Sequence, residues 1–289
     1  MNASSAKILD GRHVADRLID NVRKAVDAKS GHAEHPPGLA VVLVGDDPAS
    51  EVYVANKIKA CDRAGIRSVS HRLPLGVGRG ELLALIDELN SSDEINGILV
   101  QLPLPRHLDE QLITERIHPD KDVDGFHPVN IGRLASRNPG LRPCTPRGVM
   151  SLMHAHGIDV KGRDALVVGA SNIVGRPLAL ELLLAGATVT VAHRFTRDLE
   201  KHVRRADLLC VAVGRPDLID PEWVLSGAVV IDIGISRKPD GGLRGDLDFA
   251  AVSQRAAWIT PVPGGVGPMT VATLMQNTAE AAGLMVRAP

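Results

Sequence analysis

The sequence has little of several features that would direct it to particular partners. Aromatic residues make up 2% of its 289 residues, which is thin for a surface that stacks nucleic-acid bases. Lys and Arg total 33 against 34 Asp and Glu, so the net charge is −1. A near-neutral balance gives no electrostatic reason to bind nucleic acid or an anionic membrane. We therefore expect neither of these partners.

Cysteine and long apolar runs are also scarce. The three cysteines are far apart and odd in number, and none belongs to a C-x-x-C pair: Cys61, Cys144 and Cys210. This argues against a disulfide framework or a structural zinc site and fits a reducing cytoplasm. The longest uncharged stretch, residues 256–279, is broken by prolines and glycines, so a membrane-spanning helix is not predicted there. The first 11 residues are partly charged and have no apolar core, so no signal peptide is predicted.

Short β-branched runs alternate with longer amphipathic stretches in the first half. Residues 39–44 and 97–102 are predicted as buried strands, because each is a continuous apolar run. After the first strand, Asp47 and Pro48 predict the start of a helix and Gly65 its end. This alternation predicts a parallel sheet covered by helices. Further predicted elements are a strand at 69–73 and helices at 79–89 and 109–116.

A proline-rich stretch separates this half from a second α/β series. Residues 104–146 are predicted as mostly irregular connections and active-site loops, and a helix at 147–156 follows. The second series has predicted strands at 165–168, 188–192, 208–213, 228–233 and 258–260, with helices at 175–184 and 198–206 and a final helix at 271–284. Such a series is typical of a dinucleotide-binding half.

The segment Gly-Ala-Ser-Asn-Ile-Val-Gly-Arg-Pro at 169–177 lies between a predicted strand and a predicted helix. Glycine at such a turn lets the backbone approach a pyrophosphate, and the helix N-terminus offers unpaired N–H groups to the anion. The segment departs from G-x-G-x-x-G, because Ser171 replaces the middle glycine and the spacing is one residue longer. A plain tight turn therefore stays open as an alternative.

The end of the next predicted strand bears on the choice of cofactor. An acidic residue at this point typically binds the ribose of NAD, but the sequence here offers no carboxylate before Asp198. Arg194 can instead pair with a 2′-phosphate through two parallel hydrogen bonds. This favours NADP, with an ordinary surface arginine as the alternative.

Tyr53 and Lys57 are four residues apart on a predicted helix, so they share one face. A lysine on a partly buried face loses its proton easily and can act as acid or base, although an arbitrary lysine is more often solvated. Gln101 ends a predicted parallel strand, where ligands of α/β sheets collect.

Asp122 and Asp124 lie in the proline-rich region. Two aspartates in D-x-D spacing are a weak indication of a metal, and the rest of a calcium-binding pattern is missing. We therefore predict no metal. The sequence also has no G-x-S-x-G and no G-x-x-x-x-G-K-[ST], so serine-hydrolase and nucleotide-triphosphatase functions have no support.

Taken together and in order, six segments resemble the bifunctional methylenetetrahydrofolate dehydrogenase/cyclohydrolases of the bacterial type. They are Tyr53–Lys57, Gly97–Pro105, Pro119–Phe126, Arg142–Pro146, Gly169–Pro177 and Thr260–Thr270. They span nearly the whole chain.

The resemblance implies an α/β protein with two domains and a cleft between them. A folate-binding catalytic domain would span 1–148 plus 270–289, and a Rossmann-like NADP-binding domain would span 149–269. It implies oxidation of 5,10-methylenetetrahydrofolate with NADP and hydrolysis of the product to 10-formyltetrahydrofolate. It also implies a homodimer formed through the cofactor domain, and a cytoplasmic enzyme whose one-carbon units serve purine, methionine and histidine biosynthesis.

The resemblance also assigns the catalytic residues. Lys57 would be the general acid/base of the cyclohydrolase step, with Tyr53 contacting the folate. Gln101 would hold Lys57 and help to keep it neutral, and Asp124 would bind the pterin ring.

A second set of roles concerns the cofactor and the rest of the folate site. Residues 261–268 would line the folate and nicotinamide site, with Thr145 near the nicotinamide. Many relatives carry an arginine at the position of Ala170, and that arginine helps to hold the 2′-phosphate of NADP. In this sequence, binding of the 2′-phosphate would depend more on Arg194. The other implied cofactor contacts are Gly169, Ala170, Ser171 and Ile235, and the substrate contacts in the loop are Pro263, Gly264 and Gly265.

Two other functions stay open. One is a different NADP-dependent oxidoreductase, such as a shikimate-type dehydrogenase, which would need another set of substrate residues. The other is a catalytically silent, dinucleotide-binding regulatory subunit. The intact set of Tyr53, Lys57, Gln101 and Asp124 argues against this second alternative.

Overall fold

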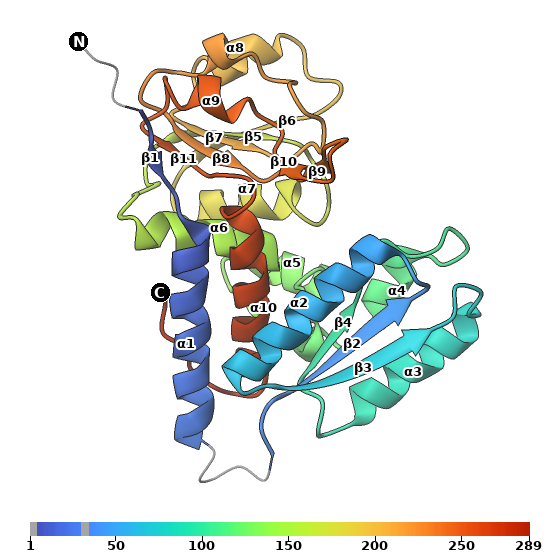
Figure 1. The fold of residues 1–289 in the computed structure, drawn as a ribbon. Coiled ribbons are helices and arrows are strands. Elements are labelled where there is room, and N and C mark those ends of the chain that lie inside the picture. Colours follow the sequence, from blue (N-terminus) through green and yellow to red (C-terminus); the bar gives the residue numbers. More distant parts are fainter. Residues whose placement is uncertain (1–4, 30–34) are drawn as a thin grey trace. The chain divides into compact units, whose positions relative to one another are not determined.

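The computed structural model describes residues 5–29 and 35–289 and divides into two compact units. The three-stranded unit comprises Asp16–Cys144 and Val271–Pro289, and the six-stranded unit comprises the N-terminal segment up to Ala15 and Thr145–Thr270. Both are drawn in Figure 1.

The three-stranded unit is built on a parallel sheet with the strand order β3-β2-β4. Its elements are α1 (Gly11–Lys29, whose first turn lies in the other unit), β2 (Gly38–Val44), α2 (Pro48–Ala64), β3 (Arg67–Leu73), α3 (Arg79–Ser91), β4 (Gly97–Val100), α4 (Glu110–Arg116), the 3-10 turn η1 (Pro119–Lys121) and α5 (Pro128–Ala135). The strand–helix alternation predicted from the sequence is confirmed.

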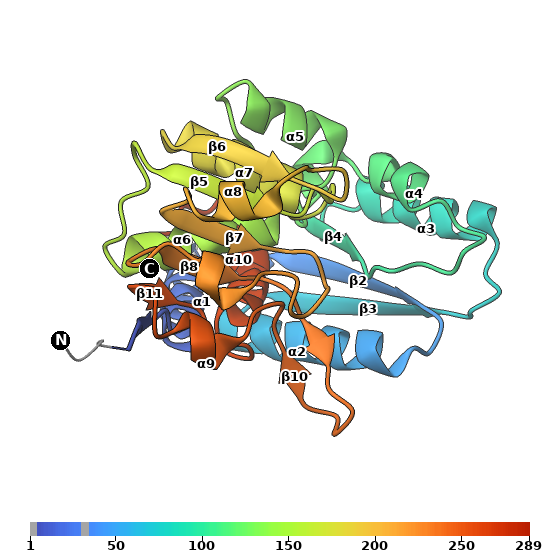
Figure 2. The same cartoon turned by 90° about the horizontal axis from the view of Figure 1, so that it is seen from above.

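Strand β2 is central because it pairs with β3 on one side and β4 on the other, and every one of its residues is buried. Successive side chains of a strand point to opposite faces, so Ala40 and Val42 join Leu82 and Ile86 of α3 in one core cluster. Helix α2 covers the other face, and Figures 1 and 2 show α2 and α3 on opposite sides of the sheet.

Helix α2 begins and ends where its capping residues predict. The Asp47 carboxylate accepts a hydrogen bond from the Ser50 N–H at 2.8 Å, which satisfies one of the unpaired donors of the first turn. At the other end Gly65 has φ +72°, a left-handed conformation that glycine adopts at little cost. These two residues fix the length of the helix that carries Tyr53 and Lys57.

In the described part of the chain, the six-stranded unit has one parallel sheet with the order β1-β11-β8-β7-β5-β6. Its elements are β1 (Lys7–Ile8), α6 (Cys144–Ala155), β5 (Asp164–Val168), α7 (Gly175–Leu184), β6 (Thr188–Ala192), α8 (Leu199–Val203), β7 (Leu208–Val211), η2 (Pro221–Trp223), β8 (Val229–Asp232), the hairpin β9 (Ser236–Arg237) and β10 (Leu243–Arg244), α9 (Phe249–Val252), β11 (Trp258–Ile259) and α10 (Val266–Ala281), which continues into the other unit.

The strand order of this sheet reverses direction next to β5. The chain passes from β5 to β6 on one side and then returns to β7 on the other. Ligands of open α/β sheets bind at such a switch point, beyond the carboxyl ends of the strands. Helices α8 and α9 lie on one face of the sheet and α6 and α7 on the other (Figure 1), so both faces are covered and the binding edge is left at the strand ends.

The structure differs from the sequence-based expectations at several segments. Residues 7–8 form an edge strand on β11, where the sequence predicted no strand. Helices α1 and α5 were not predicted, although Val14, Leu18 and Val22 of α1 are buried and recur at a helical interval. Helix α10 begins at Val266 rather than 271, because Pro268 is tolerated in a first helical turn.

Within residues 5–29 and 35–289, no helix combines the length and the apolar character needed to cross a membrane.

Candidate functional site

The amine of Lys57 and the side-chain amide of Gln101 are joined in the three-stranded unit. Lys57 Nζ donates to Gln101 Oε1 at 2.9 Å, and Gln101 Nε2 donates to the Leu102 carbonyl at 2.6 Å. Because Nε2 has its own acceptor, the amide presents its oxygen to the lysine. The Gln101 N–H bonds to the Val42 carbonyl at 2.9 Å, which places this residue just beyond the carboxyl end of β4.

Asp124 completes a cluster with Lys57. Burial raises the pKa of the Asp124 carboxyl to about 6; the Lys57 charge opposes this shift and the Asp122 charge adds to it. Tyr53, one turn before Lys57 on α2, is 43% exposed and leaves its ring available to a ligand. The structure therefore brings together the predicted residues Lys57, Gln101 and Asp124.

Asp122 shapes the loop that carries Asp124. It is 1% exposed, and its carboxylate accepts the backbone N–H groups of Gly125, Phe126 and His127 at 3.2, 3.3 and 2.8 Å. The amide of Asn130 adds a fourth hydrogen bond at 2.9 Å. Burial raises the pKa of Asp122 and these donors oppose the shift. Among the residues that the structure describes, no group of potential ligands could hold a metal ion.

Asn277 of α10 also holds this loop, and it was not predicted from the sequence. Its amide donates to the carbonyls of Val123 and Arg142 at 2.7 and 2.8 Å, and the Cys144 N–H donates to the Asp124 carbonyl at 3.2 Å. In the sequence Asn277 is one of several polar residues of this helix, so only its complete burial in the structure distinguishes it. Buried polar groups are normally hydrogen-bonded, so a buried amide at this position is expected to have hydrogen-bond partners.

In the six-stranded unit, the turn after β5 fits the close approach that a dinucleotide requires. Gly169 has φ +118°, and a Cβ there would lie 2.3 Å from the Ala212 carbonyl oxygen. A Cβ at Gly175 would lie 2.0 Å from the Gly169 carbonyl oxygen, so helix α7 also needs glycine to pack this tightly. Ser171 Oγ accepts the N–H groups of Val174 and Gly175 at 3.1 and 3.3 Å, so its side chain orders the turn just before α7.

The end of β6 lies beside this turn, because the Gly169 N–H donates to the Ala192 carbonyl at 2.9 Å. Arg194 is exposed, and its guanidinium lies 4.7 Å from the centroid of the Phe195 ring. Arg176 Nε donates to the Ala170 carbonyl at 3.1 Å. Within the described parts of the chain neither Arg176 nor Arg194 forms an ion pair, so both leave N–H groups for an anion.

The remaining predicted residues also lie in the six-stranded unit. Thr145 and Thr270 share a hydrogen bond of 2.9 Å between their hydroxyls. The Gly264 carbonyl accepts the N–H of Gly11 at 3.0 Å, which ties the predicted ligand loop to the start of α1. Ile235 is 42% exposed, near the first turn of α10, where a Cβ at Gly267 would touch its Cδ1 at 3.9 Å. Pro263 and Gly265 belong to the same loop.

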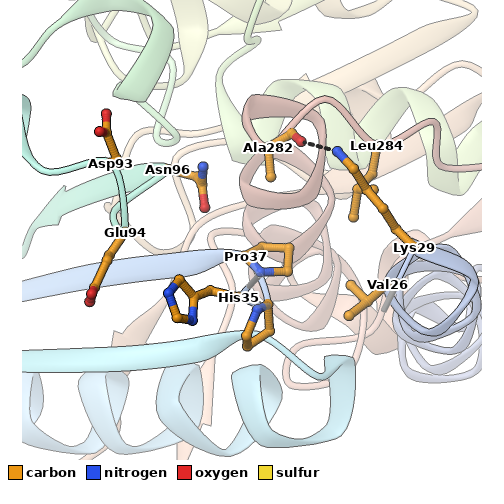
Figure 3. Close-up of a pocket in the computed structure, with 10 residues that line it drawn as sticks. Val26, Lys29, His35, Pro37, Asp93, Glu94, Asn96, Ala282 and Leu284 are labelled. Atoms are coloured by element: carbon orange, nitrogen blue, oxygen red, sulfur yellow. Dashed lines mark hydrogen bonds between the residues drawn. The ribbon is translucent and has the colours of Figure 1, made fainter. Parts of the chain in front are cut away.

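A cavity of about 630 Å³ lies elsewhere in the three-stranded unit. Figure 3 shows its lining, which includes Glu94 and Asn96 before β4 and a hydrogen bond of 3.1 Å from Lys29 Nζ to the Ala282 carbonyl. It therefore lies at the amino ends of the strands, whereas Gln101 follows the carboxyl end of β4. Ligands of parallel sheets bind at carboxyl ends, so this cavity is separate from the cluster around Lys57.

The fold and these two sets of residues define a two-domain dinucleotide-binding enzyme. Two family descriptions match the sequence: "Tetrahydrofolate dehydrogenase/cyclohydrolase, catalytic domain" over residues 9–124, and "Tetrahydrofolate dehydrogenase/cyclohydrolase, NAD(P)-binding domain" over residues 143–285. The chain belongs to the tetrahydrofolate dehydrogenase/cyclohydrolase family.

Solved structures agree with this assignment. The bifunctional methylenetetrahydrofolate dehydrogenase/cyclohydrolase of Campylobacter jejuni is 48% identical, with 96% of this chain and 99% of that chain covered and a TM-score of 0.94. The Trypanosoma brucei methylenetetrahydrofolate dehydrogenase-cyclohydrolase, solved with NADP and an inhibitor, is 38% identical, with 96% and 97% covered and a TM-score of 0.91.

A shikimate dehydrogenase of Thermus thermophilus is 17% identical, with 86% of this chain and 95% of that chain covered and a TM-score of 0.58, so it shares the fold alone. The predicted fold class, bifunctional enzyme class and NADP cofactor are confirmed, and the two alternative functions are not favoured.

Proposed function

We propose that this chain oxidises 5,10-methylenetetrahydrofolate with NADP and hydrolyses the resulting 5,10-methenyltetrahydrofolate to 10-formyltetrahydrofolate, with Lys57, Tyr53, Gln101 and Asp124 as the residues that act on the folate. The observation that carries this assignment is the Lys57–Gln101 hydrogen bond beside the Asp124 carboxylate. The amine of Lys57 supplies a proton carrier, and the amide oxygen of Gln101 holds this amine in place. The carboxylate of Asp124 supplies an anchor for the substrate.

For the dehydrogenase step, the protein must hold the dinucleotide and the folate and orient them toward each other. Gly169, Ala170 and Ser171 would receive the pyrophosphate at the turn, and Arg194 the 2′-phosphate. Ile235 and Thr145 would contact the nicotinamide end. When bound, NADP accepts the hydride from the methylene carbon. The folate nitrogens stabilise the cation that remains, so positioning is the main demand on the protein.

For the cyclohydrolase step, Lys57 would move the proton. Water adds to the methenyl carbon and gives up a proton to the lysine amine. The bond from that carbon to N5 then breaks as the lysine returns its proton to N5, the hydroxyl on the carbon loses its own proton to the solvent and becomes the formyl carbonyl, and the formyl group stays on N10. General acid–base catalysis of this kind requires one group that both accepts and donates. The hydrogen bond to Gln101 directs the amine, because one N–H is committed to Oε1.

Asp124 would hold the folate. A carboxylate accepts the N–H groups along one edge of a pterin ring, and such charge-assisted hydrogen bonds are strong. Asp122 and Asn277 hold the backbone on both sides of Asp124, which supports a preorganised anchor. Tyr53 offers an exposed ring against which the folate can pack.

The decisive experiment follows both reactions with purified protein. 5,10-Methylenetetrahydrofolate and NADP should give a rise in methenyltetrahydrofolate absorbance followed by its decay, with 10-formyltetrahydrofolate identified by chromatography. NAD and shikimate are tested in parallel. A protein that binds NADP but leaves methylenetetrahydrofolate unchanged would overturn the proposal.

We further propose a homodimer formed through the six-stranded unit. In the described part of the chain β6 is an edge strand, paired only with β5. Val191 on this strand is 36% exposed and Leu183 on α7 is 55% exposed; proteins rarely leave an apolar sheet edge uncovered. Sedimentation should show a dimer for the wild type and a monomer for Val191→Lys, and a monomeric wild type would contradict this.

We also propose a cytoplasmic location, because all three cysteines are buried free thiols and reducing compartments keep thiols in this form. There its product would serve purine, methionine and histidine biosynthesis as a carrier of one-carbon units. Fractionation of cells that produce the tagged protein tests the location.

A further inference from the structure

Two buried carboxylates in the six-stranded unit take no part in the chemistry described above. Asp232 ends β8 and is 4% exposed, and Asp246 follows β10 and is fully buried. Asp232 Oδ1 accepts the Asp246 N–H and Oδ2 accepts the Leu247 N–H, both at 3.0 Å. The two aspartates thereby connect the end of a sheet strand with the segment that follows the hairpin.

Asp246 reaches a second strand end with its own carboxylate. Its Oδ2 accepts the N–H groups of Val213 and Gly214 at 2.8 and 2.9 Å, directly after β7. The preceding residue, Ala212, has the carbonyl that Gly169 approaches. One carboxylate is therefore bonded to the segment against which the dinucleotide turn packs.

Glycines make room for these charges. A Cβ at Gly234 would lie 2.1 Å from Cγ of Asp246, and a Cβ at Gly245 would lie 2.0 Å from Oδ2 of Asp232. Gly234 immediately precedes Ile235, the expected cofactor contact. Burying a carboxylate is costly unless hydrogen-bond donors surround it. The backbone leaves room for two such carboxylates, which indicates that they hold the segments to which they are bonded.

We propose that Asp246 is a positioning residue for the dinucleotide: its carboxylate holds the turn after β7, while its backbone N–H is bonded to Asp232 at the end of β8, and together these bonds set the arrangement that receives the cofactor. The proposal rests on the NADP site proposed above. It assigns Asp246 no contact with the reacting atoms.

Asparagine at 246 makes a useful comparison with alanine. Asp246 Oδ1 has no hydrogen-bond partner in the described structure, so the Nδ2 group of Asn can occupy its place while the amide oxygen accepts from Val213 and Gly214. Asp246→Ala removes the acceptor altogether. Asp240→Ala is the matched control, because Asp240 is an exposed hairpin residue that accepts the Gly242 N–H at 2.9 Å.

The first measurement is NADP binding by calorimetry, which needs no turnover. Asp246→Ala should weaken binding about tenfold or more, as expected for losing hydrogen bonds to a charged group. Asp246→Asn should restore most of the affinity, and Asp240→Ala should bind as the wild type does. The cyclohydrolase rate with methenyltetrahydrofolate, which requires no dinucleotide, should stay unchanged in all three. Unchanged NADP affinity in Asp246→Ala, or equal losses in NADP affinity and cyclohydrolase rate, would overturn the proposal.

A pH profile of Asp246→Asn gives a second readout, which also serves if the alanine variant does not fold. Burial raises the pKa of Asp232 to about 6; the N–H groups of Asp246 and Leu247 oppose the shift and the Asp246 charge adds to it. Other charged groups line the same cavity as Asp232: Asp217, Arg237, Lys238, Asp240, Arg244 and Asp248. Removing the Asp246 charge should lower the pKa of Asp232.

The wild type should therefore lose NADP affinity as the pH falls through about 6, and the variant should lose it only at lower pH. The 2′-phosphate itself titrates near pH 6, so the comparison is between variant and wild type with the same ligand. If Asp246→Asn loses NADP affinity at the same pH as the wild type, the proposal is overturned. A wild type that binds NADP but does not oxidise methylenetetrahydrofolate would remove the proposed function and leave this test intact.

Discussion

Lys57 Nζ donates a hydrogen bond of 2.9 Å to Gln101 Oε1, although 44 residues separate the two side chains. The contact arises because β2 leads into α2 while β4, its parallel neighbour, ends just before Gln101. Both side chains thus reach the same carboxyl edge of one sheet. Five expected outcomes follow from this site and from the dinucleotide turn.

Lys57→Met should abolish hydrolysis of methenyltetrahydrofolate, because the proton acceptor is lost. General acid–base groups contribute about 10²–10⁴-fold in rate, so a loss in that range is expected in an absorbance assay. Lys59→Met is the control, since Lys59 is exposed on the same helix. Hydrolysis at the wild-type rate in Lys57→Met would remove the lysine from its role.

Asp124→Ala should raise the folate KM in both assays, because a charge-assisted anchor is removed. The pKa of Asp124 is about 6, raised by burial, so the ionised form that accepts pterin N–H groups is lost as the pH falls through that value. The wild-type folate KM should therefore rise toward acid pH, and that of Asp124→Asn should vary less. A folate KM that is unaffected by either substitution would exclude the pterin role.

The same pKa shift predicts the stability of Asp124→Asn. A carboxyl whose folded pKa lies above its unfolded value stabilises the fold below the unfolded pKa, and this contribution is lost as the pH rises through the folded pKa. The ionised Asp124 therefore costs stability above about pH 6. Thermal unfolding measures the Tm of Asp124→Asn minus that of the wild type. This difference should be more positive at about pH 8 than at about pH 4. A Tm difference that is independent of pH would contradict this.

Arg194→Ala should raise the KM for NADP far more than that for NAD, because only NADP carries the 2′-phosphate. Hydrogen bonds to charged groups contribute about 1.5–3 kcal/mol, so an effect of about tenfold or more on NADP is expected. Arg197→Ala, a nearby exposed arginine, is the matched control. Equal increases for both dinucleotides would remove Arg194 from the phosphate site.

Gly175→Ala should destabilise the protein by about 1–3 kcal/mol, the usual cost of overpacking, and weaken NADP binding. The added Cβ would meet the Gly169 carbonyl oxygen at 2.0 Å, so α7 must move away from the turn. Gly132→Ala is the comparison, because a Cβ at this position in α5 meets nothing within 4 Å. Denaturant unfolding and calorimetry measure the two effects. Equal stabilities for the two variants would contradict the packing argument.

Much of the local structure could be predicted from the sequence. The caps Asp47 and Gly65, the buried run of β2 and the strand–turn–helix around Gly169 carry their own signals, because capping and periodicity depend on near neighbours. Helix α1 was missed although its buried residues recur at a helical interval, and α5 was missed because prolines dominate its surroundings.

The amino-acid sequence by itself determined the alternation of strands and helices, the glycine turn, and the residues that resemble a folate-dependent dehydrogenase/cyclohydrolase. Only the tertiary structure decided which of them meet. It joined Lys57 to Gln101, turned Asp122 inward to hold the Asp124 loop, and brought Asn277 from the far end of the chain to the same loop. The physical reason is that these hydrogen bonds link residues distant in the chain, and only the pairing and packing of sheets and helices sets their distances.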